Sequence, residues 1–272
     1  MTHFTDKVAV VTGAGSGIGR ALAVELARRG AKLAISDVDD QGLEETKALV
    51  KAEGADVRVD HLDVAERELM LGYADAVAEH FGRVNLVFNN AGIAFTGTVE
   101  EMSFKDVERV MDVDFWGVVN GTKAFLPHLI ASGDGHVVNI SSVFGIFAVP
   151  TQSAYNAAKF AVRGFTESLR QEMLTTNRPV KVTCVHPGGI KTNIARNADQ
   201  TEGRDHDKLS KEFDKLARMS PEKAARIILR GVEKGKARVL IGADAYALDA
   251  FVRVAGPAYQ GLVARFGKSR GL

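Results

Sequence analysis

The feature that most constrains the fold of this chain is a regular alternation of short β-branched apolar runs with longer helical patterns. The apolar runs predict strands at 7–12, 32–36, 57–62, 84–88, 135–140, 180–185 and 238–241. Helical spacing of apolar residues covers 17–29, 41–53, 67–80, 104–130, 154–173 and 222–233. This alternation is typical of βαβ units, so it predicts an α/β fold with a parallel sheet covered by helices on both faces.

The chain of 272 residues is long for one domain and short for two. It contains no internal repeat, low-complexity tract or linker-like segment, so we expect one domain over residues 1–272. Two regions break the alternation. Residues 190–219 form a long polar connection that we interpret as a substrate lid, and residues 243–272 form a C-terminal helical tail.

The composition excludes several classes of protein. Hydrophobic residues make up 46% of the chain and charged residues 25%, which excludes a disordered chain. The net charge of +1 predicts no binding of nucleic acid. Cys184 is the only cysteine, which excludes an intrachain disulfide or a multi-thiolate zinc site. With no targeting or membrane-spanning pattern either, we expect a cytoplasmic protein.

A glycine-rich turn follows the first predicted strand and opens the first predicted helix. Glycines allow a backbone to approach a pyrophosphate, whose charge then lies at the helix N-terminus. The spacing is GxxxGxG rather than GxGxxG, and an ordinary tight turn is the alternative interpretation. The predicted cofactor-binding residues of this turn are Gly13, Ser16, Gly17, Ile18 and Gly19.

Asp37 ends the second predicted strand, 20 residues after the middle glycine of the turn. An acid at this distance can bind the adenosine ribose hydroxyls and repel a 2′-phosphate. The alternative is a helix cap, for which Asp39 or Asp40 is better placed. No basic residue stands at Ser16 or Val38 to bind the extra phosphate. The sequence therefore favours NAD over NADP.

Tyr155 and Lys159 lie four residues apart in a predicted helix and share one face of it, and Ser142 precedes that helix. Oxidation of an alcohol requires removal of its hydroxyl proton. An ordinary tyrosine, with a pKa of about 10, is a poor base at neutral pH. A nearby ammonium and a cationic nicotinamide ring both favour the phenolate. This arrangement predicts Tyr155 as base or acid, with Ser142 binding the substrate oxygen.

Together these motifs resemble the short-chain dehydrogenase/reductase family over about residues 7–241. The matching segments are Thr12-Gly13-Ala14-Gly15-Ser16-Gly17-Ile18-Gly19, Asp63-Val64, Asn89-Asn90-Ala91-Gly92, Ser142 with Tyr155-Asn156-Ala157-Ala158-Lys159, and Pro187-Gly188 followed by Thr192. The resemblance implies a single-domain, Rossmann-like, doubly wound fold with about seven parallel strands. It also implies an oxidoreductase that forms a homo-oligomer, either a tetramer or a dimer.

The resemblance further implies roles that the local chemistry does not assign. Asp63 would lie near the adenine and Thr192 near the nicotinamide carboxamide, and Val64, next to Asp63, would also contact the cofactor. Lys159 would also bind the nicotinamide ribose. The remaining cofactor contacts implied by the motifs are Asn90, Ala91, Gly92, Pro187 and Gly188.

One position departs from the family pattern. The family usually has an asparagine in the helix before Ser142, where it takes part in a water-linked proton relay to the lysine, and this chain has Asp114. An aspartate can accept a hydrogen bond from that water, but it brings a negative charge toward Lys159 or needs a proton itself. Our hypothesis is that Asp114 is a working relay residue.

Apolar side chains surround the expected substrate position. Phe95 and residues 143–149 follow strands at the carboxyl edge of the sheet, where open α/β folds bind ligands. They favour a hydrophobic alcohol or ketone, and packing beneath the loops is an equal alternative. The tail is a basic amphipathic segment, for which covering a pocket or packing on a neighbouring subunit is favoured over contact with a membrane surface. His186 lacks metal-ligand spacing and is interpreted as structural.

The function predicted from the sequence is therefore hydride transfer between NAD(H) and a secondary alcohol or ketone. One alternative is an NADPH-dependent carbonyl reductase. An alternative of another class is a catalytically silent nucleotide-binding sensor or scaffold, which only Asp114 supports.

Overall fold

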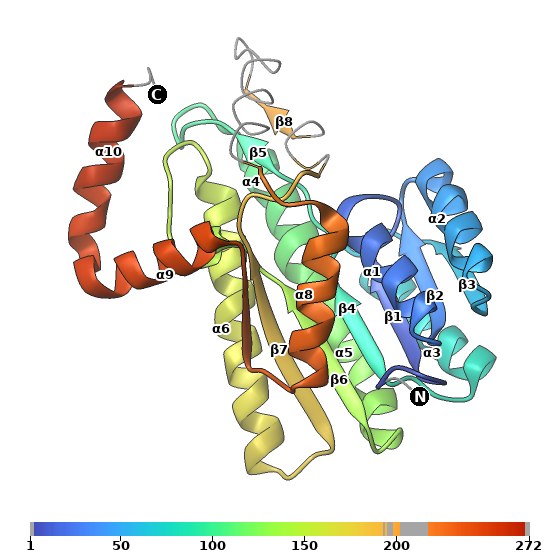
Figure 1. The fold of residues 1–272 in the computed structure, drawn as a ribbon. Helices are drawn as coiled ribbons and strands as arrows, with labels where there is room; N and C mark the ends of the chain where they lie inside the picture. Colours follow the sequence, from blue (N-terminus) through green and yellow to red (C-terminus); the bar gives the residue numbers. More distant parts are fainter. Residues whose placement is uncertain (1–2, 193, 195–197, 202–216, 270–272) are drawn as a thin grey trace.

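The computed structural model describes residues 3–192, 194, 198–201 and 217–269 (Figure 1). Seven parallel strands form one sheet in the order β3-β2-β1-β4-β6-β7-β9, which confirms the predicted fold class. The strands are β1 (Val8–Thr12), β2 (Lys32–Asp37), β3 (Val57–His61), β4 (Leu86–Asn89), β6 (Gly135–Ile140), β7 (Val180–Pro187) and β9 (Arg238–Ile241). Each lies within two residues of its predicted bounds.

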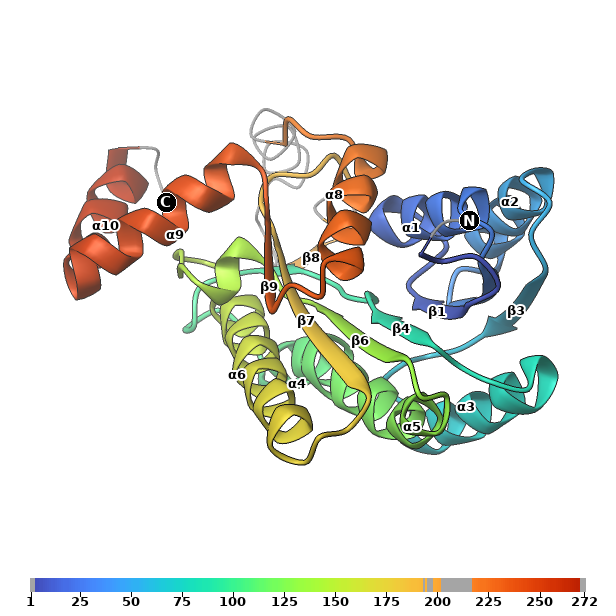
Figure 2. The same cartoon turned by 60° about the horizontal axis from the view of Figure 1, so that its bottom comes forward.

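Helices cover both faces of the sheet (Figure 2). One face carries α1 (Gly17–Arg28), α2 (Asp40–Ala52) and α8 (Pro221–Glu233). The other carries α3 (Arg67–Phe81), α5 (Gly117–Ala131) and α6 (Ser153–Thr175). Side chains of β1 alternate between the two cores, because Ala9 and Val11 join the first and Val8 and Val10 the second.

The helix predicted over 104–130 is three segments in the structure. These are α4 (Phe104–Met111), the π-helical η1 (Asp112–Trp116) and α5. The chain is therefore helical over residues 104–131, close to the predicted range, and the π segment interrupts the regular α-helical geometry. A π segment adds a residue to the turn and is frequent at functional sites, and η1 contains the fully buried Asp114.

Two elements of two residues each were not predicted. β5 (Phe95–Thr96) pairs with β8 (Asp199–Gln200) in a separate parallel ladder. β8 belongs to the region predicted as a lid, most of which lies outside the described residues. The two ends of that region meet, because Lys191 N–H donates to the Met219 carbonyl at 2.8 Å.

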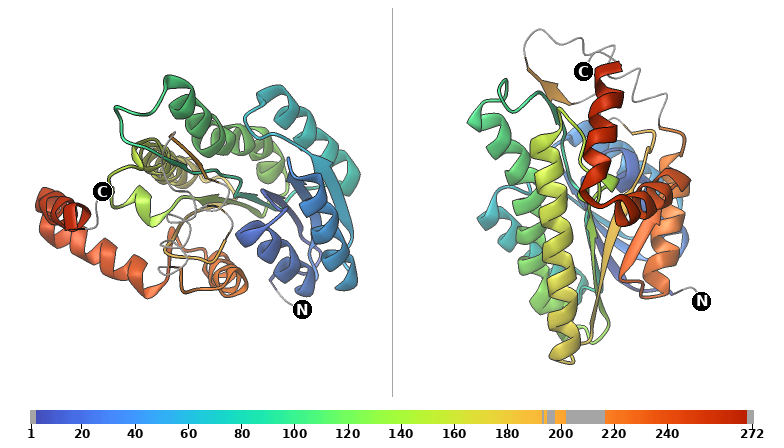
Figure 3. Two further views of the ribbon diagram at one scale, coloured as in Figure 1. Left: turned by 90° about the horizontal axis from the view of Figure 1, so that it is seen from above. Right: turned by 90° about the vertical axis from the view of Figure 1, so that its left-hand side faces the viewer.

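The described part of the C-terminal tail consists of α9 (Ala243–Ala255), the 3₁₀ turn η3 (Gly256–Ala258) and α10 (Tyr259–Ser269). Figure 3 shows α9 and α10 projecting from the layered body, and α9 contacts β9. Within the described ranges, no helix combines the length and the apolar character that crossing a membrane requires.

The carboxyl ends of β1 and β4 lie side by side at the centre of the sheet. From β1 the chain continues to β2 on one side, whereas β4 leads to β6 on the other. Open α/β sheets bind ligands at such a switch in strand order. The glycine turn follows β1 and Asn90 follows β4, so the fold brings both predicted motifs to this point.

Candidate functional site

The glycine turn is built so that side chains are excluded from it. Gly13 and Gly17 have φ of +64° and +52°, which favour glycine. A Cβ at Gly13 would lie 2.7 Å from Ala91 Cα, and one at Gly19 would lie 2.0 Å from the Gly13 carbonyl oxygen. Ser16 is the N-cap of α1, whose first turn contains no acid. The turn therefore places bare backbone at a helix N-terminus that favours anions.

Side chains from two other loops border this turn. Asn90 Nδ2 donates to the carbonyls of Thr12 at 2.9 Å and Gly13 at 3.1 Å, which ties the end of β4 to the turn. A Cβ at Gly17 would lie 3.1 Å from Thr192 Cγ2. The structure therefore brings three predicted cofactor segments together.

Asp37 lies beside the turn at the end of β2. Its Oδ2 accepts the Gly15 N–H at 2.7 Å, and its Oδ1 accepts the N–H of Val38 at 2.8 Å. Asp39 caps α2 by accepting the Gly42 N–H. The capping alternative therefore belongs to Asp39, and Asp37 lies at the edge of the glycine turn.

The segment after β3 also lies close to β2, because Leu62 N–H donates to the Asp37 carbonyl at 2.9 Å. Asp63 accepts the Ala65 N–H at 2.9 Å, so it also stabilises its own turn. The Val64 carbonyl accepts Asn120 Nδ2 at 3.0 Å. The structure thus places Asp63 and Val64 beside the end of the strand that carries Asp37, and their contact with a bound cofactor stays a prediction.

Ser142, Tyr155 and Lys159 converge at the carboxyl end of β6. The Ser142 hydroxyl lies close enough to Tyr155 to lower the pKa of its phenol. Lys159 Nζ lies 5.4 Å from the centroid of the Tyr155 ring. Ser142 precedes the 3₁₀ turn η2 (Val143–Gly145), and its Oγ accepts the Phe144 N–H at 3.1 Å. The structure therefore brings the three predicted catalytic residues together.

Asp114 forms a buried ion pair with Lys159. Its Oδ2 lies 3.0 Å from Lys159 Nζ, and its Oδ1 accepts the Ile93 N–H at 2.7 Å. Asp114 is fully buried, and Lys159 is 3% exposed. The carboxyl group therefore contacts the lysine directly, at the family position where an aspartate is expected to approach Lys159.

The ionisation of the three groups is coupled. Burial raises the pKa of Tyr155; Lys159 lowers it and Asp114 raises it, and the net direction is upward. Burial lowers the pKa of Lys159, but Asp114 and Tyr155 outweigh burial and leave it raised. Burial raises the pKa of Asp114 more than Lys159 lowers it. The ammonium acts on Tyr155 in the expected direction, but burial prevails.

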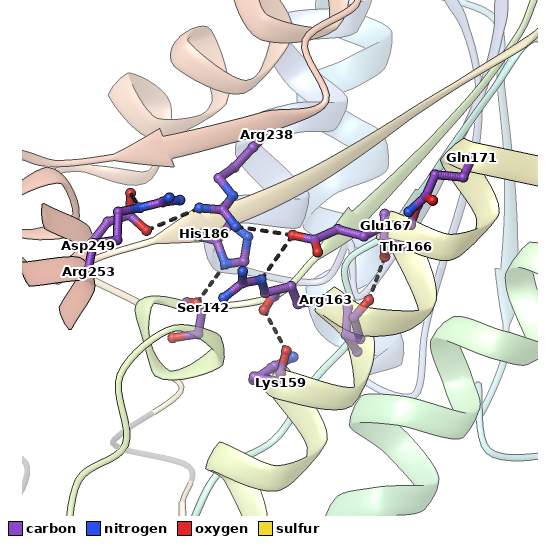
Figure 4. Close-up of polar contacts among 12 residues, drawn as sticks. Ser142, Lys159, Arg163, Thr166, Glu167, Gln171, His186, Arg238, Asp249 and Arg253 are labelled. Carbon is purple, nitrogen blue, oxygen red and sulfur yellow. Dashed lines mark hydrogen bonds and ion pairs between the residues drawn. The ribbon is translucent and has the colours of Figure 1, made fainter. Parts of the chain in front are cut away.

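His186 supports the backbone of Ser142, a contact that the sequence did not predict (Figure 4). Its Nδ1 lies 2.9 Å from the Ser142 carbonyl oxygen, so it donates there. Burial lowers its pKa to about 4, which leaves the ring neutral. His186 is interpreted as a structural residue, and the Ser142 carbonyl is the group that it holds. No local sequence signal indicates such a contact, because 44 residues separate the two.

The apolar segments near the site are mostly packed. Phe95, Ile146 and Phe147 are buried, and Phe95 belongs to a small core with Ala154. Phe144 is only half-buried and meets the Tyr155 ring edge-on, with 6.2 Å between ring centroids. Phe95 thus follows the packing alternative, whereas Phe144 lies beside a candidate catalytic residue.

The end of β7 contacts the tail. Gly189 N–H donates to Asp244 Oδ2 at 2.8 Å, and a Cβ at Gly188 would lie 2.2 Å from the same oxygen. Pro187 is the last residue of β7 and pairs with Ile241. The predicted Pro187-Gly188 motif therefore lies between the sheet edge and the start of α9.

Comparison with known proteins shows the family. Residues 7–203 match the family model described as short chain dehydrogenase. SadH of Mycobacterium tuberculosis, classed as an oxidoreductase, is 64% identical over 265 residues, which cover 97% of this chain and 96% of SadH. The chain belongs to the short-chain dehydrogenase/reductase family of oxidoreductases.

Solved structures support the same assignment. A short-chain dehydrogenase/reductase from Burkholderia phymatum in complex with NAD has a TM-score of 0.87 and 30% identity, covering 94% of this chain and 95% of the other. Levodione reductase has a TM-score of 0.80 and 31% identity, covering 91% and 100%. In sequence, levodione reductase of Leifsonia aquatica is 37% identical over 216 residues, covering 78% and 80%.

Proposed function

We propose that this protein is an NAD(H)-dependent oxidoreductase that interconverts a hydrophobic secondary alcohol and its ketone. The observation that carries the proposal is the convergence of the Ser142 and Tyr155 hydroxyls beside the buried ammonium of Lys159. These groups lie at the carboxyl edge of the sheet, next to the glycine turn.

The turn fits a dinucleotide. Its glycines leave no space for side chains, and its backbone opens the N-terminus of α1. We assign Gly13, Ser16, Gly17, Ile18 and Gly19 to the pyrophosphate. We assign Asp63 and Val64 to the adenine side, and Asn90, Ala91, Gly92, Pro187, Gly188 and Thr192 to the nicotinamide side.

The surroundings of Asp37 support NAD as the preferred form. Its carboxylate borders the turn and would repel a 2′-phosphate. The residue that follows the turn in the chain is Arg20, whose guanidinium donates to the carbonyls of Gly15 and Gly42 and to Glu45 at 2.8 Å. Because this arginine is already paired, it offers little to an added phosphate.

The catalytic roles follow from the geometry. In alcohol oxidation, the Tyr155 oxygen accepts the hydroxyl proton, and in ketone reduction it returns the proton to the carbonyl oxygen. Ser142 holds that oxygen by a hydrogen bond, and Lys159 stabilises the phenolate. A bound nicotinamide supplies hydride acceptance or donation at the carbinol carbon. Lys159 also binds its ribose.

Asp114 sets the charge that Tyr155 experiences. We assign it to the catalytic group as the counterion of Lys159 and the candidate relay residue. A full negative charge within an ion pair partly cancels the field of the ammonium at the phenol. The phenolate therefore forms at higher pH than it would beside an uncompensated lysine, which favours Tyr155 as the acid in ketone reduction.

A panel of secondary alcohols and ketones of increasing apolar size, assayed with NAD(H) and NADP(H), tests the proposal. We expect turnover with NAD(H) and a rise in kcat/KM with apolar size. Faster turnover with NADP(H) would replace the cofactor assignment with that of a carbonyl reductase. Cofactor binding without turnover across the panel would favour a nucleotide sensor or scaffold.

A further inference from the structure

Tyr259 is the one buried residue between positions 246 and 265 of the C-terminal tail. It is 8% exposed, and every other residue from 246 to 265 is half-buried or exposed. It stands where η3 joins α10, at the bend of the tail. A buried aromatic residue in an otherwise exposed segment indicates a specific contact.

That contact is with the loop that follows Ser142. The rings of Tyr259 and Phe147 have centroids 5.1 Å apart and planes inclined by 38°. The Ala148 N–H donates to the Tyr259 hydroxyl oxygen at 3.3 Å. One tail residue, 111 positions away in the chain, therefore binds both a side chain and the backbone of the loop.

The body of the protein holds the loop 143–149 at its two ends. At the start, a Cβ on Gly145 would lie 2.5 Å from the Lys159 carbonyl oxygen, so η2 lies directly against α6. At the end, Asn156 Nδ2 donates to the Val149 carbonyl at 2.8 Å. Tyr259 binds the stretch between these points, beside the half-buried Phe144 that touches Tyr155.

The tail is itself anchored to the catalytic helix by a chain of ion pairs (Figure 4). Arg253 pairs with Asp249 at 2.9 Å, and Asp249 pairs with Arg238 of β9 at 3.1 Å. Arg238 continues to Glu167 of α6 at 3.1 Å. Tyr259 therefore acts from a segment that is fixed against the same helix that holds Tyr155 and Lys159.

We propose that Tyr259 is a positioning residue that fixes the middle of the 143–149 loop and so determines which apolar substrates fit beside Tyr155. The inference rests on the proposed function. The hydrogen bond from Ala148 N–H to the Tyr259 hydroxyl fixes the position of the loop backbone, and the ring contact fixes the position of the Phe147 side chain. Loss of either contact allows the loop to shift beside Tyr155 and leaves the glycine turn unchanged.

Two variants separate these contacts. Tyr259→Phe keeps the ring and removes the acceptor of the Ala148 N–H, and Tyr259→Ala removes both. We expect Tyr259→Phe to raise KM for the best apolar substrate roughly three- to tenfold, as one lost hydrogen bond would. Tyr259→Ala should raise it further and flatten the preference for large substrates. KM for NAD should stay unchanged in both.

The matched controls are Tyr246→Phe and Tyr246→Ala, because Tyr246 lies on the same tail and is 59% exposed. They should leave both KM values unchanged. Amide hydrogen exchange provides a readout independent of turnover: residues 146–149 should exchange faster in Tyr259→Phe and not in Tyr246→Phe.

Unchanged substrate KM and size preference in active Tyr259 variants would overturn the inference and leave the proposed function intact. Equal changes in the KM of substrate and NAD would also overturn it, because they would indicate general loosening. A wild-type enzyme inactive toward the whole panel would overturn the proposed function, and the specificity role with it.

Discussion

The pairing of Asp114 with Lys159 is the residue contact with the clearest consequence for the chemistry. Both side chains are buried, and the carboxylate also accepts the Ile93 N–H. Removing one partner of a buried ion pair strongly destabilises the folded protein, because the other charge remains buried without a counterion. A substitution that keeps the shape is therefore the informative one.

We expect Asp114→Asn to move the pH profile of alcohol oxidation to lower pH. Burial is the largest cause of the raised Tyr155 pKa and stays unchanged, but the upward contribution of Asp114 is lost. The phenolate then forms at lower pH. The measurement is kcat/KM against pH, with exposed Asp112→Asn as the control. Full turnover and an unchanged profile in both Asp114→Asn and Asp114→Ala would show that Asp114 has no role.

The Asp37 carboxylate should set the cofactor preference. Asp37→Asn keeps an oxygen acceptor and removes the charge, so we expect kcat/KM for NAD to fall roughly 10-fold or more and discrimination against NADP to shrink. Steady-state kinetics with both cofactors provide the check. Exposed Asp40→Asn is the control, and a preference that Asp37→Asn leaves unaltered would refute the assignment.

At the scale of elements, the sequence located the regular structure well and the irregular structure poorly. Strands such as β1 have a short, β-branched apolar run that ends at a glycine-rich turn, so their bounds could be predicted. β5 and β8 have two residues each, too few to show a period. The π segment η1 keeps the apolar pattern of its neighbours, so nothing in the spacing separates it from α4 and α5.

The ionic anchor of α9 gives a prediction at this scale. Asp249→Asn removes the acid that bridges Arg238 and Arg253. Because the two ion pairs are partly exposed to solvent, we expect the free energy of unfolding to fall by only about 0.5–1 kcal/mol. Amide exchange in α9 should accelerate more than in β1. Glu108→Gln, at an exposed position of α4, is the control. Unchanged exchange in α9 would mean that the ion pairs do not hold the tail.

At the scale of the whole molecule, two buried histidines tie stability to pH. Burial lowers the pKa of His136 to about 3 and that of His186 to about 4. Below about pH 6.5 the two histidines bind protons in the unfolded chain but stay neutral in the folded protein. The free energy of unfolding therefore decreases as the pH falls. At about pH 5, each histidine should lower the free energy of unfolding by about 2 kcal/mol.

Denaturant unfolding at a series of pH values measures this effect. We expect His136→Gln to flatten the decline between pH 6.5 and about 4, because the glutamine does not titrate. Exposed His80→Gln should leave the slope as it is. An unfolding free energy that stays constant down to pH 4 would contradict the buried, neutral state of both rings.

The candidate site was largely predictable because its parts follow strand ends in order. Parallel strands bring Gly13, Asp37, Asn90 and Ser142 to one edge of the sheet whatever the loops between them do. Contacts across the fold were not predictable in this way. The His186–Ser142 and Tyr259–Ala148 bonds join residues 44 and 111 positions apart, and no periodic pattern records them.

The central claim is that Tyr155 moves the proton while hydride leaves the carbinol carbon. The most direct measurement follows deuterium from the carbinol carbon of an apolar secondary alcohol into NADH by mass spectrometry, in the wild type and in Tyr155→Phe. We expect deuterated NADH from the wild type, and from Tyr155→Phe unchanged NAD binding with product formation reduced at least about 100-fold. Equal deuterium transfer by both proteins, or none by the wild type with any alcohol, would contradict the claim.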